Sequence, residues 1–232
     1  MTETETTPEF DLYADDYDAA LAQGLAATGE DKDYFARGRV RWLAAAVARL
    51  DVRPRSVLDF GCGTGSATPH LFAELGVERV VGVDVSPKSL EVARRTYGAR
   101  AEFRLIEEGG PEGEFDLAYT SGVFHHIPPA ERARSVAYVF RALRPGGLYA
   151  FWENSPWNPG TRFVMSRCPF DRDAVMLSPP AARRLLRGGG FQIVRTDFLF
   201  IFPAALSFLR RLEPPLSRLP LGGQYLVLCR KA

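Results

Sequence analysis

One short stretch constrains the fold of this chain more than any other. Residues 57–65 read VLDFGCGTG, so an apolar run ends in the carboxylate of Asp59 and three glycines follow at alternate positions. Glycine lets the backbone turn tightly and approach a ligand closely, and a helix after the turn directs free N–H groups at that ligand. The pattern is typical of the first strand–turn–helix unit of a doubly wound α/β sheet, and it predicts a nucleoside-containing cofactor.

The glycine spacing and the acid favour one type of cofactor. Dinucleotide-binding turns usually read GxGxxG, whereas here the third glycine comes one residue early and Ser66 holds the expected position. The Asp59 carboxylate would repel a pyrophosphate and attract an ammonium group. S-adenosylmethionine carries an ammonium group and no phosphate, so it is the predicted cofactor, and a glycine turn without a ligand is the alternative. The residues of this turn expected at the cofactor are Asp59, Gly61, Cys62, Gly63 and Gly65.

A second acid follows at the distance expected for a ribose contact. Residues 79–87 read RVVGVDVSP, which predicts a buried strand that ends at Asp84, about 20 residues after the glycine turn. The two carboxylate oxygens can accept hydrogen bonds from both ribose hydroxyls, and Val85 can lie against the adenine. Ser86 and Pro87 favour a helix start at this point. The alternative role for Asp84 is ordinary helix capping.

These motifs together resemble the class I S-adenosylmethionine-dependent methyltransferases, in their small-molecule branch. Residues 59–65 match the first motif of that family and Asp84 matches the second. Residues 115–128 resemble its fourth strand and the loop that follows, and residues 143–148, LRPGGL, are similar to its turn before the fifth strand. The resemblance covers roughly residues 50–152, and the motifs occur in the family's order.

The resemblance also implies cofactor contacts outside the glycine turn. Ser121 lies in the matching fourth-strand segment, and we expect it to contact the cofactor. After the third strand the sequence departs from the family pattern, and Glu107 is the candidate for the adenine contact there. Tyr13, Tyr17 and Asp18 match a family segment that folds over the cofactor, with Tyr17 as the expected contact. The alternative is a helix that packs both rings on the domain surface.

Strand-like and helix-like segments alternate from residue 55 onward, which is typical of a parallel sheet. The pattern predicts strands near 56–60, 79–84, 101–105, 115–119, 147–152, 191–202 and 224–230, and helices near 33–50, 66–75, 87–97, 130–143 and 178–187. The resemblance implies an α/β, doubly wound, Rossmann-like methyltransferase fold, whose seven-stranded, mostly parallel sheet has an antiparallel last strand.

The predicted domain organisation has two parts. Residues 1–50 form an N-terminal helical lid or cap segment, and residues 51–232 form the core domain with insertions at about 154–177 and 203–221. The first insertion follows the fifth strand at the carboxyl edge, where ligands bind in such sheets, so it is the expected acceptor pocket. The second insertion begins after a strand taken as antiparallel, and we expect it at the other end or a flank.

Three residues are candidates for catalysis. His125 and His126 follow the fourth strand, and histidine can take a proton near neutral pH. They are adjacent, so we expect their side chains to point apart, with at most one facing the acceptor; loop structure is the alternative role. Glu153 ends the fifth strand beside Trp152 and Trp157, and it is expected to bind or deprotonate the acceptor, or to cap the loop.

Composition narrows the class of partner. The net charge of +1 gives no global basic field, so no nucleic-acid partner is expected. No apolar run is long enough to span a membrane, and three scattered cysteines form neither a zinc pattern nor a disulfide framework. We therefore expect a cytoplasmic monomer or homodimer without a metal.

The expected function is S-adenosylmethionine-dependent methyl transfer to an oxygen, nitrogen or carbon atom of a small-molecule acceptor. That acceptor is expected to be a secondary metabolite or an envelope or lipid-linked precursor. An RNA or protein methyltransferase is one alternative, and a non-catalytic cofactor-binding protein is the other.

Overall fold

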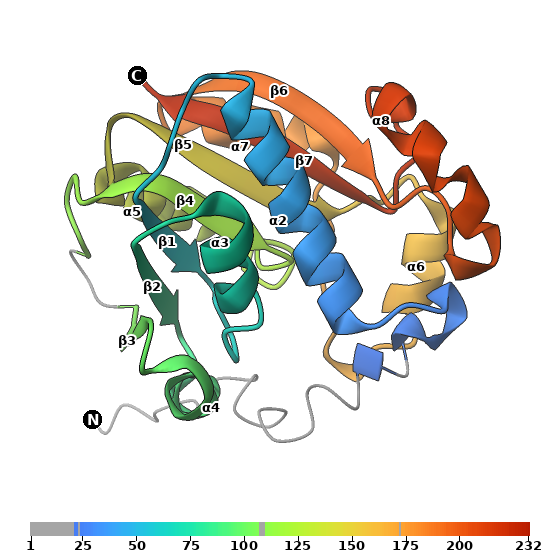
Figure 1. Ribbon diagram of the computed structural model, residues 1–232, viewed down its shortest axis with the longest axis horizontal. Helices are drawn as coiled ribbons and strands as arrows, with labels where there is room; N and C mark the ends of the chain where they lie inside the picture. Colours follow the sequence, from blue (N-terminus) through green and yellow to red (C-terminus); the bar gives the residue numbers. More distant parts are fainter. Residues whose placement is uncertain (1–20, 23, 107–109, 172) are drawn as a thin grey trace.

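A single twisted sheet organises the molecule (Figure 1). The computed structural model describes residues 21–22, 24–106, 110–171 and 173–232. The strand order is β3-β2-β1-β4-β5-β7-β6, with bounds β1 Ser56–Phe60, β2 Arg79–Asp84, β3 Glu102–Leu105, β4 Phe115–Ser121, β5 Leu143–Asn154, β6 Phe191–Leu199 and β7 Gln224–Lys231. Neighbouring strands are parallel from β3 to β5, and β7 is antiparallel to both β5 and β6. The predicted fold class is confirmed.

Helices cover both faces of the sheet. The longer helices are α2 Lys32–Ala48, α3 Thr68–Leu75, α4 Pro87–Tyr97, α5 Arg132–Ala142 and α7 Pro179–Gly188. The shorter elements are η2 Ala26–Thr28, α6 Pro159–Met165, η3 Pro169–Asp171, η4 Ala204–Leu212 and α8 Glu213–Leu216. Side chains of α2, α3 and α4 contribute to one hydrophobic cluster, and those of α5 and α7 contribute to the other.

The two clusters follow from the alternation of side chains along the strands. On β1, Val57 packs in the cluster that holds Leu43 of α2, whereas Leu58 packs in the cluster that holds Val136 of α5. A parallel sheet buried on both faces needs apolar residues at successive positions, which explains why β1 is buried along its whole length. The α2 helix therefore belongs to the cover of the sheet, and its Leu43 is fully buried.

The sheet places the predicted cofactor motifs at one edge. The strands β2 and β4 flank β1 on opposite sides, so chain connections diverge at the carboxyl end of β1 and leave a crevice there. The α4 helix begins as predicted, because the Ser86 side chain accepts a hydrogen bond from the N–H of Ser89 at 3.1 Å and Pro87 occupies the first helical position. This start holds Asp84 and Val85 at the rim of the crevice.

The position of the second insertion differs from the expectation. Because β6 and β5 are both antiparallel to β7, they run in the same direction. Residues 203–221 therefore leave the sheet at the same edge as residues 154–177, and η4 and α8 lie on the side of the molecule that carries α6 (Figure 1). The Thr161 hydroxyl donates to the carbonyl of Gly223 at 2.7 Å, and the Asn158 amide donates to the carbonyl of Leu221 at 2.8 Å.

Two of the predicted regions lie outside the part of the chain that the structure describes. Tyr13, Tyr17 and Asp18 of the expected lid lie outside the described residues, as does Glu107. Among the residues that the structure does describe, no helix has the length and apolar character that crossing a membrane would require.

Candidate functional site

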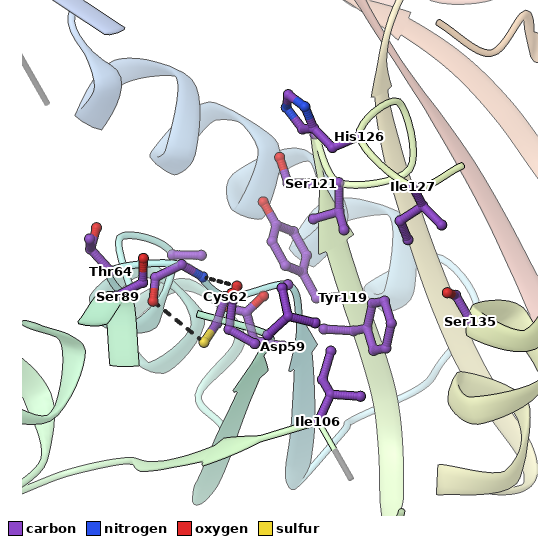
Figure 2. Close-up of a pocket in the computed structure, with 18 of the residues that line it drawn as sticks. Asp59, Cys62, Thr64, Ser89, Ile106, Tyr119, Ser121, His126, Ile127 and Ser135 are labelled. Carbon is purple, nitrogen blue, oxygen red and sulfur yellow. Dashed lines mark hydrogen bonds between the residues drawn. The ribbon is translucent and has the colours of Figure 1, made fainter. Parts of the chain in front are cut away.

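A cavity of about 600 Å³ opens at the carboxyl ends of β1, β2 and β4 (Figure 2). Eight of the predicted site residues line it, namely Asp59, Gly61, Cys62, Gly63, Asp84, Val85, Ser121 and His126. Three others, Gly65, His125 and Glu153, are not among its lining residues. The cavity therefore gathers most of the expected cofactor contacts and one of the three catalytic candidates.

The glycine turn shapes the floor of this cavity. Gly61 and Gly63 have φ values of 73° and 51°, in the left-handed region that favours glycine. A Cβ on Gly61 would come within 2.4 Å of Val123, whereas a Cβ on Gly63 would meet no atom within 4 Å. The space above Gly63 is thus open to the cavity. Gly65 instead faces α4, where a Cβ would lie 3.0 Å from Tyr97.

The Asp84 carboxylate is held by backbone groups on both sides. Its Oδ2 atom accepts a hydrogen bond from the N–H of Gly63 at 2.8 Å, and its Oδ1 atom accepts one from the N–H of Ser86 at 2.9 Å. These bonds fix the orientation of the carboxylate, and a carboxylate oxygen can accept more than one hydrogen bond. Beside it, Val85 is 53% exposed and lines the cavity together with Ile106.

The Asp59 carboxylate is buried and incompletely satisfied. The residue is 2% exposed, and its Oδ2 atom has no hydrogen-bond partner among the described residues. Burial and the neighbouring Asp84 raise the pKa of Asp59 to about 7, and Arg39 acts in the opposite direction. Because an unpaired buried carboxylate costs free energy, this oxygen fits a ligand that brings a hydrogen-bond donor with positive charge.

Two further lining residues, Arg39 and Tyr119, were not among the predicted site residues. Arg39 of α2 donates from Nε to the Tyr119 hydroxyl at 3.2 Å and from Nη1 to the side-chain oxygen of Gln224 at 3.0 Å. Both Arg39 and Tyr119 line the cavity. Helical spacing is the sequence signal that places Arg39 toward the sheet. Arg39 lies one turn before Leu43, which is buried against the sheet, and residues four apart share a helix face.

Of the catalytic candidates, His126 lines the cavity, whereas His125 and Glu153 are buried outside its lining. The Nδ1 atom of His125 lies 2.6 Å from Oε2 of Glu153, and the Oε1 atom of Glu153 accepts a hydrogen bond from the N–H of Phe124 at 2.7 Å. Glu153 is therefore buried with both oxygens engaged. Burial opposes the charged ring of His125, yet Glu153 and Asp171 outweigh it and raise the pKa of His125 to about 10.

The two histidines do not point apart as expected. Their ring centroids are 4.1 Å apart, because a turn that joins the N–H of His126 to the carbonyl of Val123 brings both rings to one side. Both Nε2 atoms lie 3.4 Å from Oδ1 of Asp171. Burial, together with the charge on His125, lowers the pKa of His126 to about 4.

The two tryptophans expected beside the acceptor lie elsewhere. Trp152 is 1% exposed within the core, and Trp157 stacks on Phe198 with an interplanar angle of 25°. Neither is among the lining residues of the cavity.

Comparison with known proteins decides the family. Residues 57–147 match the family model described as a methyltransferase domain, and this range holds the glycine turn, Asp84 and Ser121. Residues 57–147 thus form a methyltransferase domain of the class I S-adenosylmethionine-dependent type. The cofactor of this family is S-adenosylmethionine, and the unsatisfied Asp59 oxygen, the open space above Gly63 and the fixed Asp84 carboxylate all fit it.

Three relatives illustrate what this chain is similar to. It is 38% identical over 116 residues to a methyltransferase of Synechocystis that is described as uncharacterized, covering 49% of this chain and 54% of the relative. It is 34% identical to a trans-aconitate 2-methyltransferase of Methylobacterium nodulans, covering 65% and 56%. It is 31% identical to a demethylmenaquinone methyltransferase of Symbiobacterium thermophilum, covering 67% and 60%. The chain thus spans little more than half the length of these relatives.

Solved structures support the same fold over nearly the whole chain. An S-adenosylmethionine-dependent methyltransferase from Thermotoga maritima aligns with a TM-score of 0.64 at 18% identity, covering 96% of this chain and 98% of that one. A chain of the Haloferax volcanii complex between the Trm112 activator and a methyltransferase aligns with a TM-score of 0.65 at 20% identity, covering 96% and 97%. At these identities the likeness concerns the fold.

Proposed function

We propose that this protein transfers the methyl group of S-adenosylmethionine to a small, anionic acceptor. The observation that carries the proposal is the extent of the cavity. It continues from the glycine turn past Ser121 to a second region lined by Ile127 and Ser135 (Figure 2). Its volume of about 600 Å³ lies in the range of sites for small ligands, so a cofactor and a small acceptor are the occupants that it fits.

The cofactor region offers a complementary group for each part of S-adenosylmethionine. Asp84 would accept the ribose hydroxyls, and the exposed face of Val85 would contact the adenine. Asp59 would pair with the ammonium group, and Arg39, which lies close enough to lower the pKa of Asp59, would pair with the carboxylate. Opposite charges at the two ends of an amino-acid group fix its orientation. When bound, the cofactor supplies an activated methyl group on a sulfonium.

The rest of the cavity is rich in positive charge. Besides Arg39, which is assigned to the cofactor, Lys32, Arg134 and Arg141 line the cavity, and among the described residues Glu131 is the one other lining acid besides Asp59 and Asp84. A cavity wall of one sign raises the local concentration of oppositely charged ligands, so these residues favour an acceptor that carries a carboxylate or phosphate. The trans-aconitate named for one group of relatives is an acid of this kind.

The chain's own contribution to the reaction is then positioning. An acceptor carboxylate is already deprotonated at neutral pH and needs no general base. Glu153, whose oxygens are both engaged with the β4 loop, is assigned to holding that loop and not to contacting the acceptor. The basic residues would orient the nucleophile, and orientation of two reactants can itself supply a large part of the rate enhancement.

A labelling experiment tests the proposal. The protein is incubated with S-adenosylmethionine carrying an isotopically labelled methyl group and with acidic metabolites, neutral metabolites or total RNA. We expect mass spectrometry to find the label in a small molecule of the acidic fraction, and to find none with Asp84→Ala. The exposed Asp33→Ala variant, outside the cavity lining, is the matched control and should label normally. Label only in RNA or protein would refute the proposal, and label only in neutral metabolites would refute the anionic acceptor.

A further inference from the structure

We infer that His125, His126 and Asp171 form a binding site for one zinc ion. The three side chains come from two segments that are far apart in the sequence, the loop after β4 and the short helix η3. Their donor atoms all lie within 4.8 Å of one another, and Oδ1 of Asp171 is 3.4 Å from Nε2 of each histidine. No sequence motif pointed to this site, because Asp171 lies in the irregular first insertion.

Two of the three distances between donor atoms match those of a tetrahedral zinc site. Zinc bonds to histidine nitrogen and carboxylate oxygen at about 2.1 Å, which places tetrahedral donors about 3.4 Å apart. Oδ1 of Asp171 lies at that distance from both nitrogens. Two imidazoles and one carboxylate are also a donor set that zinc prefers and that magnesium and calcium do not.

The Asp171 oxygen makes only ion-pair contacts and no hydrogen bond with the described residues. The side chain is 7% exposed, and its Oδ1 atom accepts no hydrogen bond from any described residue, although two ring nitrogens lie nearby. At 3.4 Å these contacts are longer than a typical N–H···O hydrogen bond of about 2.7–3.2 Å. The pocket also holds a second buried carboxylate, that of Glu153, and a divalent cation would balance both negative charges.

The outer contacts resemble those that orient metal ligands. Glu153 holds Nδ1 of His125 at 2.6 Å, which leaves Nε2 directed at Asp171. A carboxylate on the far nitrogen of a histidine fixes its tautomer and its orientation toward a metal. Glu153 is itself anchored by the N–H of Phe124. The structure thus assigns Glu153 a positioning role at this site.

Backbone contacts hold the two ligand-bearing segments together. The N–H of Val175 donates to the carbonyl of His125 at 2.8 Å. The guanidinium of Arg132 donates to the carbonyls of Ile127 and Val175 at 2.9 Å and 2.6 Å. The donors are therefore brought together before an ion arrives, which lowers the cost of ordering them on binding.

The site also has routes for an ion to enter. His126 lines the main cavity, and Asp171 lines a second cavity of about 460 Å³. The donors thus lie between two hollows, with 3%, 15% and 7% of the side chains of His125, His126 and Asp171 exposed. A zinc ion here would tie the first insertion to the β4 loop and stiffen one wall of the main cavity.

Zinc titration of the chelator-treated protein tests the inference without any activity measurement. We expect one zinc ion per chain by competition with a chromophoric chelator, and a higher Tm in its presence. Asp171→Asn and His126→Asn should each weaken zinc binding about 100-fold or more, because each removes one of three protein ligands. Glu153→Gln should weaken it about 10-fold to 100-fold, as expected for a partner of a ligand.

The third histidine of the chain provides the matched control. His70 pairs with Asp33 at 2.8 Å and belongs to no cluster of three donors among the described residues, so His70→Asn should bind zinc like the wild type. Circular dichroism confirms that each variant is folded. Absence of stoichiometric binding in the wild type would overturn the inference, as would unchanged affinity in folded Asp171→Asn and His126→Asn. Neither result would bear on the proposed methyl transfer.

Discussion

The buried Asp59 carboxylate makes cofactor binding depend on pH. Its pKa of about 7 means that about half of the ligand-free molecules carry a protonated Asp59 at neutral pH. Only the ionised form offers the charge that the cofactor ammonium requires, so binding below pH 7 must also remove a proton. We therefore expect the affinity for S-adenosylhomocysteine to fall about 10-fold between pH 8 and pH 6, which corresponds to about 1.4 kcal/mol.

The Asp59→Asn variant separates this group from other titrations. It should bind the ligand more weakly than the wild type at pH 8, and its affinity should change little between pH 8 and pH 6. Isothermal titration calorimetry at pH 6, 7 and 8 measures both affinities. An equal pH dependence in the wild type and the variant would refute the assignment of Asp59, and so would an affinity that rises as the pH falls.

Asp59 affects the stability of the ligand-free protein in the opposite direction, because stability falls as the pH rises whereas cofactor affinity increases. Its folded-state pKa is raised from 3.8 to about 7, so its contribution to stability is present below pH 4 and is lost as the pH rises through 7. The rise corresponds to about 4 kcal/mol at most. Asp59→Asn should therefore increase the Tm of the ligand-free protein at pH 8, and a lower Tm would contradict the burial argument.

Three further predictions concern neighbouring residues. Asp84→Ala should weaken cofactor binding by up to a few kcal/mol, since hydrogen bonds to a charged acceptor contribute about 1.5–3 kcal/mol each; unchanged affinity by calorimetry would exclude the ribose contact. Gly63→Val should abolish cofactor binding in a folded protein, because its side chain would enter the open space above the turn at a φ of 51°; retained binding with a normal circular dichroism spectrum would show that this space is not used. Glu153→Gln should lower the Tm by weakening the bond to His125 while cofactor affinity stays within about 2-fold; a loss of cofactor affinity in the folded variant would place Glu153 at the cofactor.

Local sequence patterns predicted the elements that hold the cofactor motifs. The strands β1 and β2 and the helix α4 have the predicted bounds, because the glycine turn and the Ser86–Pro87 helix start are encoded within a few residues. The strand β5 begins at Leu143, earlier than predicted, since residues 143–146 were taken as a turn. Local patterns do not predict contacts that depend on packing between segments far apart in the sequence.

Arg39 and Asp171 illustrate that limit. Arg39 meets Tyr119 across 80 positions of sequence, and helical spacing alone does not say which face of α2 covers the cavity. Asp171 meets the two histidines only because the first insertion folds back onto the β4 loop through the backbone bond between Val175 and His125. Adjacent side chains point in opposite directions in an extended chain, but the turn after Val123 brings the rings of His125 and His126 to one side.

The two insertions share one edge of the sheet, and this has a consequence for how the protein could diversify. The bonds from Thr161 to Gly223 and from Asn158 to Leu221 couple the loops after β5 and β6, while the cofactor motifs belong to β1, β2 and β4. A lineage could therefore exchange residues 154–177 and 203–221 for other segments without altering any residue that lines the main cavity. Because hydrogen bonds couple the two segments, they would have to be inherited or transplanted as a pair. A chimera that exchanges only one of them would lose the bond between Asn158 and Leu221.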